Sequence, residues 1–118
     1  MKNRIITITD DGNVTVPSET KMSISEIADL FGIYYQTAKK HIRAIEKSSI
    51  ANGDYSMGCL VSGNHIYAED YGLEMVIVVA FRVQSEKAEI FRKWVTRRIT
   101  QSRTRVVFTT FSNNTIMN

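Results

Sequence analysis

The segment from Ser23 to Ile45 constrains the fold more strongly than any other part of the chain, because it predicts two short helices joined by a sharp turn. Ser23 can cap the first helix with its hydroxyl, and Glu26 can reach back to the N–H of the cap to complete a capping box. Gly32 would end this helix, since glycine adopts a left-handed backbone conformation without steric cost. The apolar stripe expected to face the core is Ile27, Leu30 and Phe31.

A second helix is predicted over residues 35–47. Ala38, Ile42 and Ile45 recur at four- and three-residue steps, so they are expected to face the core. Ala28 would lie where the two helices cross, because a larger side chain there would push them apart. The pair therefore resembles a helix-turn-helix, whose second helix enters the major groove of DNA.

The exposed side of this second helix carries residue types that bind DNA. Gln36 at its leading end can pair with adenine, and Tyr34 can contact a thymine methyl group or a phosphate. Lysine and arginine residues further along can bind phosphate or guanine. With a hairpin turn and a later basic helix added, the predicted DNA-binding residues are Tyr34, Tyr35, Gln36, Lys39, Lys40, Arg43, Lys47, Asn64, Arg97 and Arg98.

The net charge of +3 is unevenly distributed along the chain. Residues 1–86 contain 8 Lys/Arg and 11 Asp/Glu, whereas residues 87–105 contain seven Lys/Arg and only Glu89 as an acid. A smaller basic group at residues 39–47 lies inside the acidic part. Two basic patches favour an anionic partner, although a solvated helix face has the same charge pattern.

Alternating patterns predict two β-hairpins. Ile6 and Ile8 alternate with threonines, and the turn residues 10–13 precede a returning strand at 14–16. Residues 58–62 and 65–68 flank Gly63-Asn64, a dipeptide suited to a tight turn. Because the second hairpin follows the predicted recognition helix, it is interpreted as a wing.

The remaining elements are each predicted from a different kind of pattern. Asp70 is expected to cap the next element, in which Met75 to Phe81 fits a strand by its β-branched content and either a strand or a helix by its length. Ser85 is expected to start a helix with acidic residues first and basic residues later. Residues 105–111 are predicted as a strand.

These patterns together predict one α+β domain, since 118 residues suit a single core. The expected fold is a winged helix-turn-helix with an N-terminal β-hairpin and additional C-terminal helices. Residues 1–104 would form the winged-helix DNA-binding domain, including the basic helix. Residues 105–118 would form a short, strand-like C-terminal extension.

The arrangement resembles the RhuM family of bacterial proteins from about Ile5 to Arg98. The parts that carry the resemblance are the opening hairpin, Ile27-Ala28-Asp29-Leu30-Phe31-Gly32-Ile33, Lys40-His41-Ile42, the segment from Asp70 to Ser85 and Phe91-Arg92-Lys93-Trp94-Val95-Thr96. Within the last piece, Phe91-Arg92-Lys93-Trp94-Val95 is also similar to phage antirepressor domains of the Bro-N type. The resemblance implies a DNA-binding or regulatory protein, of a kind often carried on mobile elements or pathogenicity-type islands, and a helix over residues 75–81.

No constellation of residues typical of an enzyme, a metal site or a cofactor site is found, so no catalytic residue, metal or cofactor is predicted. Cys59 is expected to be a small buried residue and His41 a packing residue. For Arg82, an internal salt bridge with Glu74 or Glu86 is favoured over a contact with phosphate. The longest apolar run, 75–81, is far shorter than the about 20 residues of a membrane span. A cytoplasmic protein without a membrane partner is expected.

The predicted function is therefore duplex DNA binding, either sequence-specific or general, by a transcription-factor-like regulator. Double-stranded DNA is the expected partner, and a homodimer is possible. The alternative is a protein-interaction or antirepressor-type module in which the helix-turn-helix is only a scaffold. In that case the surface around Trp94 or the segment 105–111 would engage the partner.

Overall fold

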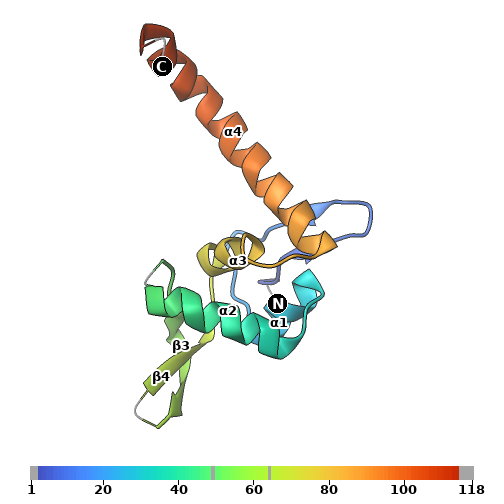
Figure 1. The fold of residues 1–118 in the computed structure, drawn as a ribbon, viewed down its shortest axis with the longest axis vertical. Helices are drawn as coiled ribbons and strands as arrows, with labels where there is room; N and C mark the ends of the chain where they lie inside the picture. The colour runs from blue at the N-terminus through green and yellow to red at the C-terminus, as the bar shows by residue number, and fades with distance from the viewer. Residues whose placement is uncertain (1–2, 49, 64, 115–118) are drawn as a thin grey trace.

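The computed structural model of the chain describes residues 3–48, 50–63 and 65–114. This part of the chain forms a small α+β fold with four helices and two separate two-stranded antiparallel sheets (Figure 1), as the sequence predicts at the level of fold class. In chain order the elements are β1 (Thr7–Ile8), β2 (Val14–Thr15), α1 (Ile24–Phe31), α2 (Tyr35–Ser48), β3 (Asp54–Ser62), β4 (His65–Asp70), α3 (Leu73–Ala80) and α4 (Glu86–Asn114).

The two predicted helices and the turn between them are confirmed. The N–H of Glu26 donates to Ser23 Oγ at 3.2 Å and the N–H of Ser23 donates to Glu26 Oε1 at 2.8 Å, so a capping box opens α1. Gly32 ends α1 in the left-handed region with a φ of 65°. The N–H of Ile33 donates to the carbonyl of Ala28 at 3.0 Å, which closes the turn before α2 begins at Tyr35.

The core lies between α1, α2, α3 and the first half of α4. Phe31 of α1 and Phe91 of α4 meet edge to face with ring centroids 5.8 Å apart. Figure 1 shows α3 lying between α2 and α4, which explains why this short helix is so apolar. The helix implied by the resemblance over residues 75–81 is therefore found. Four of its residues are fully buried: Met75, Val76, Val79 and Ala80.

The start of α3 differs from the prediction, because Asp70 does not cap it. Asp70 is paired with Asp54 in the β3–β4 ladder, and Tyr71 exchanges backbone hydrogen bonds with Met22 at 2.8 and 2.9 Å. The backbone stays extended through both residues. The cap position consequently falls on Gly72, which makes no side-chain cap bond.

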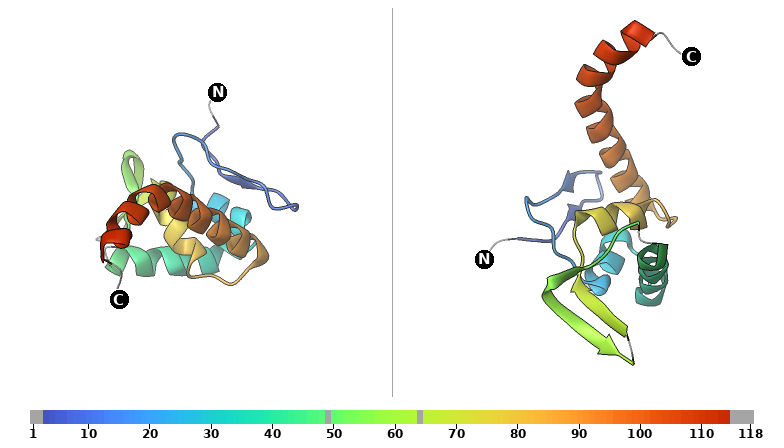
Figure 2. Two further views of the ribbon diagram at one scale, coloured as in Figure 1. Left: turned by 90° about the horizontal axis from the view of Figure 1, so that it is seen from above. Right: turned by 90° about the vertical axis from the view of Figure 1, so that its left-hand side faces the viewer.

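The last element, α4, is one helix of 29 residues, so the strand predicted at 105–111 is wrong. The β-branched and aromatic residues there favour a strand locally, but a helix that has already nucleated adds residues at little cost. No glycine or proline interrupts residues 86–114. At about 1.5 Å per residue α4 is about 43 Å long, and its second half rises away from the other elements (Figure 2).

None of the helices in the described part of the chain combines the length and the apolar character that crossing a membrane requires.

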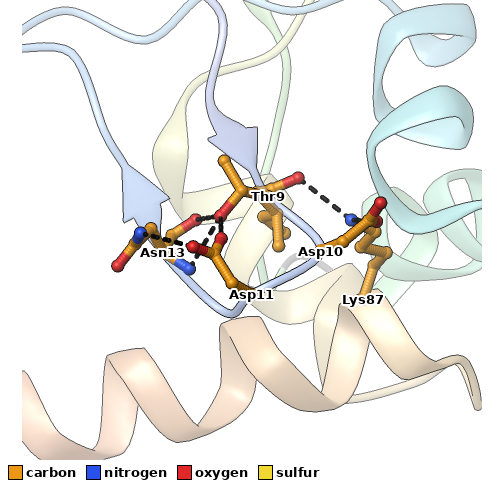
Figure 3. Close-up of polar contacts among 6 residues, drawn as sticks. Thr9, Asp10, Asp11, Asn13 and Lys87 are labelled. Atoms are coloured by element: carbon orange, nitrogen blue, oxygen red, sulfur yellow. Dashed lines mark hydrogen bonds and ion pairs between the residues drawn. The ribbon is translucent and has the colours of Figure 1, made fainter.

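The N-terminal hairpin of β1 and β2 is fastened to α4 by Lys87. In the turn between the two strands, the N–H of Thr9 donates to the carbonyl of Asn13 at 2.9 Å. Lys87 Nζ donates to the carbonyl of Ile8 at 3.1 Å and to Asp10 Oδ1 at 2.8 Å (Figure 3). The hydrogen bond from Lys87 lowers the pKa of the Asp10 carboxyl. This lysine of the basic segment therefore has a structural partner.

Phe91→Ala is expected to lower the free energy of unfolding by about 3–5 kcal/mol, because it removes a fully buried ring from the junction of α1 and α4. Ile99→Ala is the matched control on the same helix, since Ile99 is half exposed, and its effect should stay within about 0.5 kcal/mol. Urea unfolding followed by circular dichroism measures both. Equal losses for the two variants would contradict the placement of Phe91 in the core.

Candidate nucleic-acid interface

The outward face of α2 is the first part of the candidate interface. Ala38, Ile42 and Ile45 are fully buried against the core, as the periodicity of the sequence predicts. The residues on the opposite side of the helix follow at four- and three-residue steps and are exposed. They are Gln36, Lys40, Ala44 and Lys47.

The leading end of α2 adds two aromatic side chains to this face. Tyr34 is 85% exposed, and Tyr35 is about half exposed. The carbonyl of Tyr34 accepts from the N–H of Ala38 at 3.0 Å, so Tyr34 stands immediately before the first helical turn. Two phenol groups and the Gln36 amide therefore project from one end of the helix, where they can donate and accept hydrogen bonds.

Arg43 of α2 is held by partners within the protein. Its Nη1 donates to Glu46 Oε1 and to the Tyr71 hydroxyl, both at 2.9 Å. Its guanidinium carbon lies 3.9 Å from the centre of the Tyr67 ring, a cation–π contact. The hydroxyl of Tyr71 donates in turn to Glu46 Oε2 at 3.0 Å. The four side chains form a closed cluster, here called the Arg43 cluster, which joins α2 to β4 and to the start of α3.

The protonation states of the Arg43 cluster follow from its burial and its hydrogen bonds. Burial raises the pKa of the Tyr71 phenol to about 12, even though the hydrogen bond from Arg43 acts in the opposite direction. Burial alone would lower the pKa of Arg43, but the hydrogen bonds to Tyr71 and Glu46 outweigh it and raise the pKa. Tyr71 therefore remains a neutral donor and Arg43 a cation.

The β3–β4 hairpin extends from the body on the side of α2, away from the far end of α4 (Figures 1 and 2). Its base is tightly packed, because a Cβ on Gly53 would lie 2.2 Å from the Cβ of Ala68. Near its tip Val61 and Ile66 are directly opposed and exposed. The predicted contact Asn64 lies outside the described residues.

Cys59 of β3 is exposed, so the prediction of a buried thiol is wrong. The physical reason is that β3 pairs only with β4, and a two-stranded ribbon that extends from the body covers few of its side chains.

The basic residues of α4 are of two kinds: some hold neighbouring elements through hydrogen bonds, and others are exposed. Arg92 Nη1 donates to the carbonyls of Ala80 and Val83 at 2.7 and 2.8 Å, which satisfies acceptors left open at the end of α3. Of the predicted contacts, Arg98 lies 4.9 Å from the Trp94 ring. Arg97 is exposed and has no side-chain partner within the described part of the chain.

The predicted contacts do not gather at one place. Tyr34, Tyr35, Gln36, Lys40 and Lys47 share the exposed side of α2, while Lys39 is half buried beside them. Arg97 and Arg98 belong to α4, which Figure 1 shows on the other side of α3. The candidate interface is therefore the face of α2 with the adjacent hairpin, and the α4 cations form a separate surface.

Sequence reasoning missed Tyr67 and Tyr71, which fix the hairpin against α2. Glu46 could have been found, because it stands three residues after Arg43 on the same helix and such pairs commonly interact. The two tyrosines lie 24 and 28 residues further along the chain than Arg43. No local pattern predicts contacts across that separation.

His41 and Arg82 link α2 to the turn between α3 and α4. Arg82 Nε donates to His41 Nδ1 at 3.2 Å. Within the described residues the side chain of Arg82 therefore bonds to this imidazole and not to Glu74 or Glu86, so the expected salt bridge is wrong. Burial, and then the charges of Arg82 and Lys40, lower the pKa of His41.

The described residues contain no group of three His, Cys, Asp or Glu side chains that could hold a metal ion. Comparison of the chain with protein-family models, with curated proteins and with solved structures finds no match.

Tyr71→Phe is expected to lower the free energy of unfolding by about 1–3 kcal/mol, because Arg43 and Glu46 each lose a hydrogen-bond partner in a partly buried site. Tyr34→Phe removes the same hydroxyl from an exposed ring and should leave stability unchanged. Urea unfolding of both variants measures the difference. A Tyr71→Phe protein as stable as the native one would show that the Tyr71 hydroxyl contributes nothing to stability.

His41 is expected to make stability depend on pH. Because its pKa is lowered in the folded protein, the unfolded chain binds the proton more readily, and the free energy of unfolding falls as the pH drops below about 6.5. His41→Gln should reduce this fall between pH 7 and pH 5. The other histidine, His65, is present in both proteins and cancels in the comparison. Identical pH profiles would contradict the assignment.

Proposed function

We propose that this chain is a duplex-DNA-binding regulator in which α1, the Gly32 turn and α2 act as a helix-turn-helix. The observation that carries the proposal is the exposed face of α2, where Gln36, Lys40 and Lys47 point away from the core with two tyrosines at the leading end. An uncharged amide beside cations suits a surface that meets both base edges and phosphates. The resemblance of the sequence to the RhuM family supports the same function.

In this proposal the side chains of α2 bind different parts of the duplex according to their position along the helix. Gln36, with Tyr34 and Tyr35, meets the base edges at the N-terminal end of the recognition helix. Lys40 and Lys47, further along the same face, bind phosphates on the flanking backbone. Ala44 lies between the two lysines and is exposed, so the helix can approach the duplex closely there.

The β3–β4 hairpin takes the place of a wing in this proposal. The Arg43 cluster holds β4 against α2, so the hairpin and the recognition helix would approach the duplex as one unit. Arg43 itself acts as a brace, because its guanidinium already has a carboxylate, a phenol and an aromatic ring as partners. Arg97 and Arg98 lie across α3 and are left out of this DNA contact.

Changing Lys40 and Lys47 together to alanine is expected to weaken binding to a 20-base-pair duplex at least tenfold and to flatten its salt dependence. Each phosphate contact accounts for about 0.9 units of the slope of log K against log[salt], so two contacts account for about 1.8. Fluorescence anisotropy over a range of salt concentrations measures both quantities. Circular dichroism should be unchanged, since both lysines are exposed.

The matched control removes two charges from α4 through Lys93→Ala with Arg97→Ala. Both residues are exposed, and the affinity and slope should stay close to those of the native protein. Equal effects of the two double variants would contradict the assignment of the duplex to α2. A native protein that binds no duplex at low salt would overturn the proposed function itself.

A second candidate function is self-association of the chain, and the extension of α4 beyond the other elements favours it. Its second half extends beyond the body as helix, and the sequence of that half includes Val106, Val107, Phe108 and Phe111. An isolated helical segment of this length is marginal in water, so pairing with a second copy would stabilise it. Light scattering that gives the mass of a monomer at 100 μM would exclude this function.

A further inference from the structure

An open groove of about 440 Å³ lies between the C-terminal end of α3 and the first half of α4. The residue that follows α3, Phe81, lines the groove and leaves 55% of its surface exposed. The other lining residues all belong to α4: Glu89, Arg92, Lys93, Thr96 and Arg97. The groove therefore combines one accessible aromatic ring with a charged wall.

The backbone that presents the Phe81 ring is firmly held. The N–H of Phe81 donates to the carbonyls of Ile77 and Val78 at 3.3 and 3.1 Å, which closes the end of α3. Arg92 bonds to the carbonyls of Ala80 and Val83, on either side of Phe81. A ligand would meet an aromatic surface whose backbone is already ordered, and binding would cost little conformational entropy there.

The charges of the groove favour an acidic ligand. Three of its residues are cationic and one is a carboxylate, Glu89, which Lys93 approaches to 3.6 Å. Arg97 is exposed and lacks a side-chain partner among the residues that the structure describes. Arg92 uses Nη1 for the two carbonyls and keeps three further N–H donors on Nε and Nη2. Two guanidinium groups are therefore available to carboxylates.

We propose that this groove binds an acidic peptide segment of another protein, with an apolar side chain packed on Phe81 and carboxylates placed on Arg97 and Arg92. The inference goes beyond DNA binding and does not rest on it, because the groove is lined by Phe81 and α4, and Figure 1 shows α3 between α4 and α2. Electrostatic complementarity would select the segment and speed its association.

A peptide suits the groove better than a nucleic-acid strand does. Glu89 stands in the wall and would repel a chain of phosphates, whereas a peptide can place an uncharged or basic residue beside it. An apolar anchor surrounded by complementary charges is the usual composition of a small protein-binding site. Phe81 supplies the apolar surface for such an anchor.

The test begins with selection from a displayed library of random 12-residue peptides on the immobilised 118-residue chain. We expect the enriched peptides to carry an aromatic or aliphatic residue flanked by Asp or Glu. A synthetic peptide of the most enriched sequence, labelled with fluorescein, then reports affinity by fluorescence anisotropy. Its binding should weaken with added salt.

Two variants locate the site. Phe81→Ser and, separately, Arg97→Glu should each weaken binding of the labelled peptide at least tenfold. Arg97→Glu keeps the test decisive if Phe81→Ser fails to fold, because Arg97 is exposed and bonded to no other side chain in the described residues. Lys40→Glu, a charge reversal on α2, is the matched control and should leave peptide binding within twofold of the native value.

Three results would overturn the proposal. These are a selection that enriches no acidic peptides, enriched peptides that bind Arg97→Glu as tightly as the native chain, and duplex DNA that competes for the groove and loses affinity in Arg97→Glu. A native chain that binds no duplex but retains the acidic peptide would overturn only the proposed DNA function. The two failures are therefore distinguishable.

Discussion

The burial of Tyr71 is the constraint on which the arrangement of the other elements depends. Its backbone forms a bridge with Met22 just before α1, while its hydroxyl lies between Arg43 and Glu46 of α2. Its ring also lies close to Gly53, where an added Cβ would come within 3.0 Å of it. One fully buried residue thus contacts the N-terminal segment, α2 and the base of the hairpin, and α3 begins two positions later. Because its phenol is neutral and hydrogen-bonded to both Arg43 and Glu46, the buried hydroxyl of Tyr71 is satisfied.

The lysine and arginine side chains of this small domain have two different roles, which a count of charges does not distinguish. Arg43, Arg92 and Lys87 hold elements together through hydrogen bonds to carbonyl, carboxylate and phenol oxygens, although Arg92 bonds only to neutral carbonyls and keeps its charge. Lys40, Lys47 and Arg97 are exposed and retain their charge for a ligand. The arginine braces suit their role, because a planar guanidinium can satisfy several acceptors at once. The exposed lysines suit the phosphate contacts proposed for them, since a flexible ammonium can follow a phosphate backbone.

The features predicted correctly from the sequence are those that depend on neighbours a few residues apart. The Ser23–Glu26 capping box, the Gly32 turn and the inward side of α2 all follow from spacings of three or four residues. The expected cap at Asp70 and the strand at 105–111 failed, because pairing with Asp54 and extension of an existing helix overrode local preference. For the candidate site, periodicity predicted that Gln36, Lys40 and Lys47 point outward. It could not predict that Arg43 has partners far along the chain, or that α3 separates α2 from the α4 cations.

The turn from Ala80 to Val83 touches both sides of the molecule. Arg82 donates a hydrogen bond to His41 of α2, and Arg92 of α4 donates hydrogen bonds to the carbonyls of Ala80 and Val83. A ligand that displaces this turn from the α4 side would change the energy of the hydrogen bond from Arg82 to His41. It would thereby change the relative free energies of the conformations of α2. Thermodynamic linkage is reciprocal, so a ligand on α2 would alter affinity at the α4 side by the same factor. Ala80 at the end of α3 and the three residues that follow it therefore offer a route for allosteric coupling between α2 and α4.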